Sequence, residues 1–454
     1  MTETKLFGTN GVRGIINETM TVDLVLNLGR AIGTVLGPGK IVVGRDARMG
    51  GEMFSKSLIS GLLSTGCSII DIGQVPTPTL QFFIPREKCQ AGVVITASHN
   101  PAEFNGLKVM GMNGIEVSPA AENKIESVLS SNDFRTVDWF DIGSVYHDTR
   151  AVKMHIDGVK SQVDVATIRG RKLTVMVDSV NSVGALVTPT LMRDLGCKVV
   201  SLNSQLDGSF PTRPPEPSTE NIIELCRAVK SIGADIGIAH DGDADRATFV
   251  DENGTVVSGD QSLAIIAARV LSKKPGSTLV TPVSSGKLIE DVVKCLGGKI
   301  DWTTVGSVVV SHRLLEINAE LGGEENGGVF YPPHQSVRDG PMTAALIIEI
   351  MAKEKKSLSE LVKELPVYYN TKRKMEIPPE KMQSVSSTLL SLTEGMNRIT
   401  IDGIKIFREN GWILIRPSGT EPIYRCYSEG RTQDESDCLC FDGIKLIERA
   451  LTLS

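Results

Sequence analysis

Short β-branched runs alternate along this chain with segments in which apolar residues recur at helical spacing. The runs at residues 41–43, 68–72 and 92–95 predict buried strands, and residues 51–64 predict a helix among them. Strands that alternate with helices are typical of largely parallel sheets covered by crossover helices. The first third of the chain is therefore expected to form an α/β unit.

The alternation continues through the middle of the chain and predicts two more units of this class. The strands are expected at residues 173–177, 198–202, 235–239 and 277–282, and the helices at residues 220–232, 261–271, 287–296, 308–318 and 343–352. The final part differs, because Pro378, Pro379 and a Ser/Thr-rich segment precede strand-like runs at residues 404–407 and 412–415. We expect three α/β domains and a smaller α+β domain, at residues 1–150, 151–251, 252–366 and 367–454.

The composition excludes several classes of protein. Hydrophobic residues make up 41% of the chain and charged residues 22%, which is ordinary for a globular protein and excludes a disordered one. The net charge is −6 and the pI about 5.7. Binders of nucleic acid or anionic membranes are generally basic, so any anion site here must be local.

No apolar run approaches the roughly 18 residues that a membrane-spanning helix needs, and residues 1–14 lack the apolar region of a secretory signal. The eight cysteines are scattered without CxxC pairs, which predicts buried free thiols of a reducing compartment. We expect a cytoplasmic protein that binds neither nucleic acid nor membranes. The sequence makes no prediction of its oligomeric state.

The loop TASHNP, residues 96–101, directly follows the apolar strand at residues 92–95. Ligands gather beyond the carboxyl ends of strands in α/β sheets, and Ser98 there could carry a phosphoryl group while its neighbours handle protons. The alternative is a plain turn, since Ser, Asn and Pro are common turn residues. A Ser–His–Asp hydrolase is disfavoured because the chain has no GxSxG elbow.

The loop HDGDADR, residues 240–246, follows the strand at residues 235–239 and places Asp241, Asp243 and Asp245 at alternate positions. Three carboxylates so close together are costly without a cation, and their oxygens suit Mg²⁺. Arg246 could offset charge or hold a phosphate. An EF-hand is disfavoured, because Arg246 occupies the position that requires Gly; a solvated turn and an aspartyl-phosphate phosphatase remain alternatives.

Two later loops offer groups for sugar and phosphate. In GGEENGG, residues 322–328, Glu324 and Asn326 can bind sugar hydroxyls, although a plain Gly-rich turn is the favoured interpretation of this loop in isolation. In RPSGTEP, residues 416–422, an arginine, two hydroxyls and backbone N–H groups freed by glycine could form an anion-binding nest, with Arg425 further along. A proline turn is the alternative.

The four loops, in this order, resemble those of the α-D-phosphohexomutase superfamily, which groups phosphomannomutases, phosphoglucomutases and phosphoglucosamine mutases. The motifs TASHNP, DGDADR and RPSGTEP carry the likeness, which extends from Gly8 to about Arg425. The resemblance implies three related α/β domains with mixed sheets and a C-terminal α+β domain, arranged around a central cleft to which each contributes a loop. It also implies conversion of hexose 1-phosphate to hexose 6-phosphate through a hexose 1,6-bisphosphate.

The resemblance also assigns roles to individual residues. Ser98 would be the phosphoserine and would hold Mg²⁺ together with the three aspartates, while Arg13, Lys108 and Arg246 fall where the family keeps phosphate-handling or acid/base groups. The expected substrate-binding residues are Arg246, Thr304, Gly306, Glu324, Asn326, Arg416, Ser418, Gly419, Thr420 and Arg425.

Two departures bear on the acid/base and on the sugar. Many members place a histidine where Gly328 stands, and several place one at Ser307; Lys108 is therefore the favoured acid/base, with His99 second. His312 and His334 are expected to be structural. The predicted substrate is a small phosphosugar, glucose or mannose phosphate; phosphoglucosamine mutase and, from another class, a Mg²⁺-dependent sugar-phosphate phosphatase are the alternatives.

Overall fold

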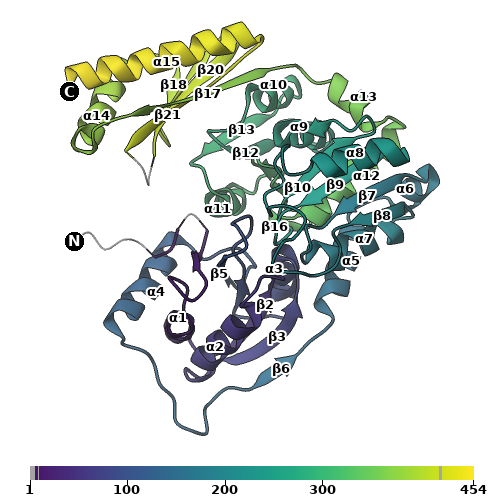
Figure 1. The fold of residues 1–454 in the computed structure, drawn as a ribbon, viewed down its shortest axis with the longest axis vertical. Coiled ribbons are helices and arrows are strands. Elements are labelled where there is room, and N and C mark those ends of the chain that lie inside the picture. Colours follow the sequence, from purple (N-terminus) through teal and green to yellow (C-terminus); the bar gives the residue numbers. More distant parts are fainter. Residues whose placement is uncertain (1–5, 9, 419–421) are drawn as a thin grey trace.

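The structure is a computed structural model and describes residues 6–8, 10–418 and 422–454. It contains four separate sheets, three of them mixed and covered by helices and the last wholly antiparallel. Figure 1 shows the fourth sheet at one end of the molecule, the first toward the other end, and the second and third between them on one side. The predicted fold class is therefore confirmed.

The first sheet has the order β1-β5-β4-β2-β3-β6. Its strands β1 to β6 are Val12–Ile15, Lys40–Arg45, Ser68–Gln74, Ala91–Ile95, Phe104–Gly111 and Val145–His147, and its helices α1 to α4 are Val22–Leu36, Gly51–Leu63, Thr77–Arg86 and Pro119–Ser131. Strands β2, β3, β4 and β6 run parallel, whereas β5 pairs antiparallel with β4 and β1.

The second sheet has the order β11-β10-β9-β7-β8. Strands β7 to β11 are Thr174–Asp178, Lys198–Leu202, Ile236–His240, Ala247–Asp251 and Val256–Val257, and helices α5 to α8 are Ala151–Lys160, Val165–Arg171, Gly184–Asp194 and Ile223–Ile232. The edge strand β11 lies just beyond residue 251. The boundaries at residues 150, 251 and 366 stay a prediction.

The third sheet has the order β13-β12-β14-β15-β16. Strands β12 to β16 are Thr278–Pro282, Lys299–Thr303, Leu321–Gly323, Val329–Tyr331 and Gln335–Arg338, and helices α9 to α13 are Gly259–Val270, Lys287–Cys295, Ser307–Ile317, Gly340–Glu354 and Leu358–Lys363. A short 3₁₀ helix, η1, spans Leu271–Lys273.

The fourth sheet has the order β17-β21-β20-β19-β18 and packs its apolar side chains against α14 and α15. Strands β17 to β21 are Tyr369–Glu376, Arg398–Ile399, Ile404–Arg408, Gly411–Pro417 and Ile423–Gly430; α14 is Met382–Leu392, α15 is Gln433–Leu453, and the 3₁₀ helix η2 is Pro379–Lys381. Arg416 and Pro417 thus belong to β20. The sequence pattern predicted instead that the strand ends at residue 415 and that both residues follow it.

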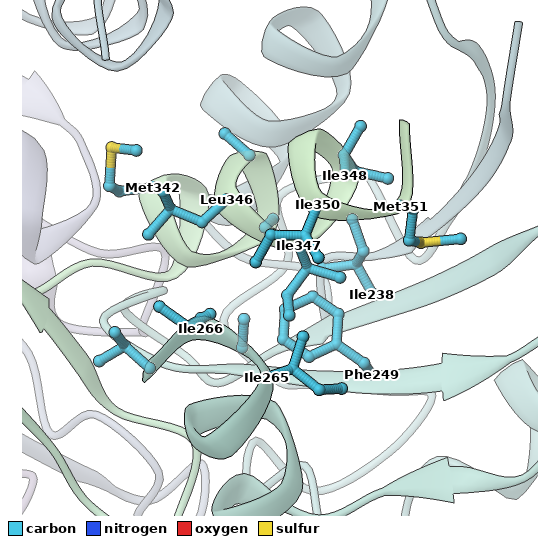
Figure 2. Close-up of a cluster of buried hydrophobic side chains, with 14 of the residues drawn as sticks. Ile238, Phe249, Ile265, Ile266, Met342, Leu346, Ile347, Ile348, Ile350 and Met351 are labelled. Carbon is cyan, nitrogen blue, oxygen red and sulfur yellow. The ribbon is translucent and has the colours of Figure 1, made fainter. Parts of the chain in front are cut away.

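The second and third sheets share one hydrophobic core, in which α12 is the common helix. Figure 2 shows Ile347 and Ile350 of α12 with Phe249 of β10 and Ile265 of α9. Asp339 caps the N-terminus of α12 by accepting the backbone N–H of Met342 at 2.9 Å. A helix buried between two sheets fixes their relative position, so the loops at their strand ends stay in register.

All eight cysteines lie in the described part of the chain and are free, as predicted. The prediction that they are buried is wrong for Cys295 and Cys438, which are exposed at the end of α10 and the start of α15. The described residues contain no helix long and apolar enough to cross a membrane.

Two glycines allow α1 and α2 to pack with their backbones in contact, which sets the position of the loop preceding α2. A Cβ on Gly61 would lie 2.2 Å from the Leu26 carbonyl oxygen, and one on Gly29 would lie 2.5 Å from that of Leu58. We expect Gly61→Ala to lower the free energy of unfolding by about 1–3 kcal/mol, because the helices must separate.

The matched control is Gly170→Ala in the last turn of α6, where an added Cβ meets nothing within 4 Å. There alanine should be neutral or stabilise by up to about 1 kcal/mol through its helix propensity. Urea unfolding of both variants checks the prediction, and equal stability of Gly61→Ala and the wild type would contradict the close packing.

Candidate active site

Ser98 lies in the tight loop after β4, with its hydroxyl directed at the aspartate loop of the second sheet. Its Oγ donates a hydrogen bond to Asp241 Oδ2 at 3.0 Å, and its residue is only 1% exposed. Its φ of 50° is uncommon for a residue with a side chain, and its N–H donates to Thr96 Oγ1 at 2.8 Å. Such a conformation persists only where the surroundings hold it.

Arg48 supplies that support from the loop after β2. Its two terminal nitrogens donate to four backbone carbonyls at 2.5–3.0 Å, those of Ser98, Asn100, Pro101 and Phe104. Asp46 lies 3.2 Å from Arg48 Nε and also accepts the Thr96 hydroxyl at 2.5 Å. One buried ion pair therefore fixes both sides of the loop that carries Ser98.

Asp241, Asp243 and Asp245 are all buried in the loop after β9, and one carboxylate oxygen of each lies within 4.8 Å of the others. Asp243 Oδ1 and Asp245 Oδ1 are buried and have no hydrogen-bond partner among the described residues. Converging carboxylate oxygens with unused lone pairs suit a hard divalent cation. These three residues therefore fit Mg²⁺.

Three cations, one from each of the first three units, surround these carboxylates. Lys108 of β5 donates from Nζ to Asp243 at 2.6 Å and to Asp245 at 3.1 Å. The other two cations and their shortest bonds to the group are Arg246 Nε to Asp241 Oδ2, 3.1 Å, and Arg338 Nη2 to Asp245 Oδ2, 2.5 Å. The negative charge of the loop is thus offset within the protein.

The pKa values follow from this arrangement. Burial, together with the charge of Asp245, raises the pKa of Asp241 to about 7. Burial acts in the same direction on Asp245, but Arg338 and Lys108 outweigh it and hold the pKa of that carboxyl well below its usual range. Burial would lower the pKa of Lys108, yet Asp243 and Asp245 raise it above its usual value, so the ammonium stays charged.

Arg246 connects the aspartate loop to Glu216 and to His99. Its two terminal nitrogens donate to the two carboxylate oxygens of Glu216, both at 3.0 Å. His99 Nδ1 lies 3.8 Å from Glu216 Oε2, with its side chain 47% exposed. Burial and the charge of Arg246 lower the pKa of His99 to about 4, so this imidazole is neutral at pH 7.

The sugar-loop candidates lie across from Ser98. Arg338 donates to Glu324 at 3.1 Å while it also contacts Asp245, so Glu324 is tied to the aspartate loop through one guanidinium. Glu324 is buried, and burial raises its pKa. Asn326 accepts the backbone N–H of Gly328 at 3.1 Å, which shapes the turn.

A cavity of about 450 Å³ joins these groups. Its lining comes from the first three units and consists of Leu6, Gly8, Asn10, Gly11, Arg13, Ser98, His99, Arg246, Val305, Gly306, Ser307, Glu324, Asn326 and Arg338. Arg13 donates to Asn100 at 2.6 Å, and Asn10 donates to the Ser307 hydroxyl at 3.0 Å. Lys108 is not among the lining residues; it is 1% exposed and bound to Asp243 and Asp245.

The residues of the fourth loop that the structure describes do not line this cavity. Arg416 lines a neighbouring cavity of about 340 Å³ between the third and fourth sheets, and Val305 belongs to both cavities. Arg425 lies opposite Arg416 in the pairing of β20 with β21, and Ser418 follows β20. Thr304 precedes Val305, while Gly419 and Thr420 lie outside the described residues.

The two histidines expected to be structural lie at contacts between units. His312 Nε2 lies 2.9 Å from the carbonyl oxygen of Glu116. His334 is buried beside His155 and Asp339, and His155 Nε2 lies 2.8 Å from Asp339 Oδ2. This second cluster joins α5, which carries His155, to the start of α12, where Asp339 is the N-cap. Asp339 directly follows Arg338 in the sequence.

Family models match almost the whole chain. The matches are described as phosphoglucomutase/phosphomannomutase alpha/beta/alpha domains I, II and III, at residues 4–136, 153–254 and 258–369, and as the C-terminal domain of the same family, at residues 350–440. The chain belongs to this family. It is thereby a member of the α-D-phosphohexomutase superfamily, as the sequence motifs had indicated.

Relatives and structures of this family match the chain from end to end. A phosphoglucomutase/phosphomannomutase of Thermococcus kodakarensis is 45% identical over 98% of this chain and 99% of its own length. A phosphoglucosamine/phosphogalactosamine mutase of Sulfurisphaera tokodaii is 43% identical over the same shares. The crystal structure of a phosphoglucomutase/phosphomannomutase family protein from Burkholderia thailandensis covers 99% of this chain and 98% of its own, with a TM-score of 0.89 and 27% identity.

Sequence reasoning missed several residues of this phosphoglucomutase/phosphomannomutase site. Arg48 lies in the loop after β2, and Arg338 is the last residue of β16. A charged residue at or just after the end of a strand was a usable signal, as it was for Asp241. Glu216 lies in a proline-rich loop that carries no such signal. Thr77, whose hydroxyl donates to Asp243 at 2.6 Å, begins α3 between two prolines and carries none either.

Arg48→Lys should loosen the Ser98 loop, because one ammonium cannot serve four carbonyls at once. Loss of about 1.4 kcal/mol of local stability would raise amide hydrogen exchange at residues 98–104 about tenfold, which mass spectrometry can measure. Arg30→Lys in α1, far from the cavity, is the control. Unchanged exchange in the Arg48 variant would show that the loop holds its shape by itself.

Proposed function

We propose that this protein is a phosphohexomutase that interconverts hexose 1-phosphate and hexose 6-phosphate, with glucose and mannose phosphates preferred. It works through a phosphoserine at Ser98 and a hexose 1,6-bisphosphate that also serves as activator. The observation that carries the proposal is the Ser98 hydroxyl 3.0 Å from Asp241, in a buried three-carboxylate group beside an arginine-lined cavity.

In the first half-reaction, the C6 hydroxyl of hexose 1-phosphate attacks the phosphorus on Ser98. The bond between phosphorus and Ser98 Oγ breaks, the bond to O6 forms, and the hydroxyl proton passes to a base of the protein. Phosphoryl transfer depends chiefly on positioning and charge stabilisation. Mg²⁺ held by Asp241, Asp243 and Asp245 would offset negative charge at the phosphoryl group.

Before the second half-reaction, the bisphosphate reorients so that its C1 phosphate faces Ser98. The bond between O1 and phosphorus breaks, the bond to Ser98 Oγ forms again, and O1 takes a proton. Arg13, Arg246 and Arg338 line the cavity and supply positive charge for whichever phosphate is held there. The phosphoenzyme is restored, and hexose 6-phosphate leaves.

Lys108 is proposed as the acid/base group, with His99 as the second candidate. Lys108 is fixed by Asp243 and Asp245, in the same loop as the Asp241 that accepts from Ser98, and it remains protonated, which suits the proton donor to O1. His99 lies on the cavity wall, partly exposed, and is neutral. The environments of the two groups thus favour opposite protonation states.

The charge of the cavity lining favours hexoses with a neutral hydroxyl at C2 over hexoses with a charged amino group there. Three arginines line it with one carboxylate, Glu324, which is already paired with Arg338. A protonated 2-amino group would therefore meet little uncompensated negative charge from the lining. Phosphoglucosamine mutase remains the second candidate, because the 43% identical relative carries the name of an amino-sugar mutase.

Phosphorus NMR with Mg²⁺, a trace of glucose 1,6-bisphosphate and glucose, mannose or glucosamine 1-phosphate tests the proposal. Phosphate should appear at C6, faster for glucose and mannose than for glucosamine. A faster rate with glucosamine 1-phosphate would select the second candidate. Release of inorganic phosphate alone would contradict mutase action and favour the phosphatase.

Ser98→Ala should lower the mutase rate by at least about 10³-fold, because no other group can carry the phosphoryl group between half-reactions. Ser60→Ala, at an exposed position of α2, should leave the rate unchanged. Both rates are measured with the same trace of bisphosphate. Undiminished conversion by the Ser98 variant would exclude the phosphoserine mechanism.

A further inference from the structure

Asp402 lies in the short turn between β18 and β19 and binds Arg416 of the neighbouring strand β20. Asp402 Oδ1 accepts from Arg416 Nε at 2.9 Å, and Asp402 Oδ2 lies 2.8 Å from Arg416 Nη2. This is the two-bond geometry that fixes the plane of a guanidinium. The arginine expected to bind phosphate is therefore oriented by a carboxylate of its own unit.

The backbone conformation of the turn allows Asp402 to approach Arg416 this closely. Gly403 has a φ of 75°, and a Cβ there would lie 2.3 Å from the Ile415 carbonyl oxygen and 2.6 Å from Arg416 Cγ. Only glycine permits both this conformation and this approach. The turn is thus packed directly on the strand that carries Arg416.

Asp402 also reaches the third unit. Its Oδ2 accepts the backbone N–H of Val305 at 3.0 Å. Val305 lines the cavity that holds Ser98, and Gly306 and Ser307 next to it line the same cavity. One carboxylate thus joins the phosphate-loop arginine to the backbone of the loop at the sugar cavity.

We propose that Asp402 is a positioning residue of the mutase, which presets Arg416 for the non-reacting phosphate and couples its position to the loop at residues 304–307. The inference rests on the proposed function and deepens it. Asp402 engages one edge of the guanidinium, and Nη1 with Nη2 forms a second edge suited to a phosphate. Because the bisphosphate exchanges its two phosphates, the same preset arginine receives the C1 and the C6 phosphate in turn.

The physical consequence is that Asp402 acts on substrate binding and not on phosphoryl transfer. Ordering a free arginine side chain costs affinity, and a preset one avoids that cost. The interaction is made equally in the bound substrate and in the transition state, so its loss should raise KM and leave kcat nearly unchanged.

The test is Asp402→Asn, which keeps the shape of the side chain and removes its charge. We expect KM for glucose 1-phosphate to rise about tenfold, kcat to fall less than threefold, and the concentration of glucose 1,6-bisphosphate needed for half-activation to rise with KM. Asp402→Glu should recover part of the affinity. Gly403→Ala, which displaces the turn from Arg416, should raise KM in the same way.

The matched control is Asp442→Asn, an exposed aspartate of α15 in the same unit, which should behave as the wild type. Wild-type KM in the Asp402→Asn variant would overturn the inference. So would a fall in kcat at unchanged KM together with a lower urea midpoint, since that is the result of a merely structural role.

Different experimental results would refute the inference and the proposed function. A wild-type protein that converts no hexose phosphate refutes the proposed function, and calorimetric binding of glucose 6-phosphate then tests Asp402 directly. In that measurement Asp402→Asn should bind about tenfold more weakly than the wild type and the Asp442 control. Equal affinities of all three proteins would overturn the role of Asp402.

Discussion

Three carboxylates buried in one loop set the electrostatic condition that the first three units must satisfy together. Burying a charge is costly unless it is paired, and Asp241, Asp243 and Asp245 are fully enclosed. Their partners Lys108, Arg246 and Arg338 come from the first, second and third units respectively. No single unit could balance the loop alone, so the site is complete only when all three units are assembled.

The same electrostatic condition bears on the proposed phosphoserine and on the divalent cation that the aspartates could hold. A phosphate on Ser98 would add nearly two negative charges within hydrogen-bond reach of Asp241. Lys108 and the arginines already offset the carboxylates, and they are held in place by them. A divalent cation among the free carboxylate oxygens of Asp243 and Asp245 would supply the additional positive charge.

The sequence predicted the strands whose carboxyl ends carry the chemistry, because those strands are short apolar runs followed by unusual loops. It missed β5, since Phe104–Gly111 contains Asn105, Gly106 and Lys108 and does not read as a buried strand. Lys108 is nevertheless 1% exposed, because two carboxylates from another unit compensate its charge. Pairing between units distant in sequence leaves no local pattern. Glu216 was missed for a different reason, because it binds Arg246 of its own unit from a proline-rich loop that carries no signal.

The fourth unit is joined to the third by specific contacts that fix the position of Arg416 relative to the sugar loop. Besides Asp402, Lys405 donates to the Ser285 carbonyl at 2.7 Å, and Trp412 and Leu414 pack on Val283. Lys405 is 1% exposed at this junction, and this burial lowers its pKa to about 8. These contacts hold Arg416 next to the loop at residues 304–307, whose Val305 lines both the cavity of Ser98 and the cavity of Arg416.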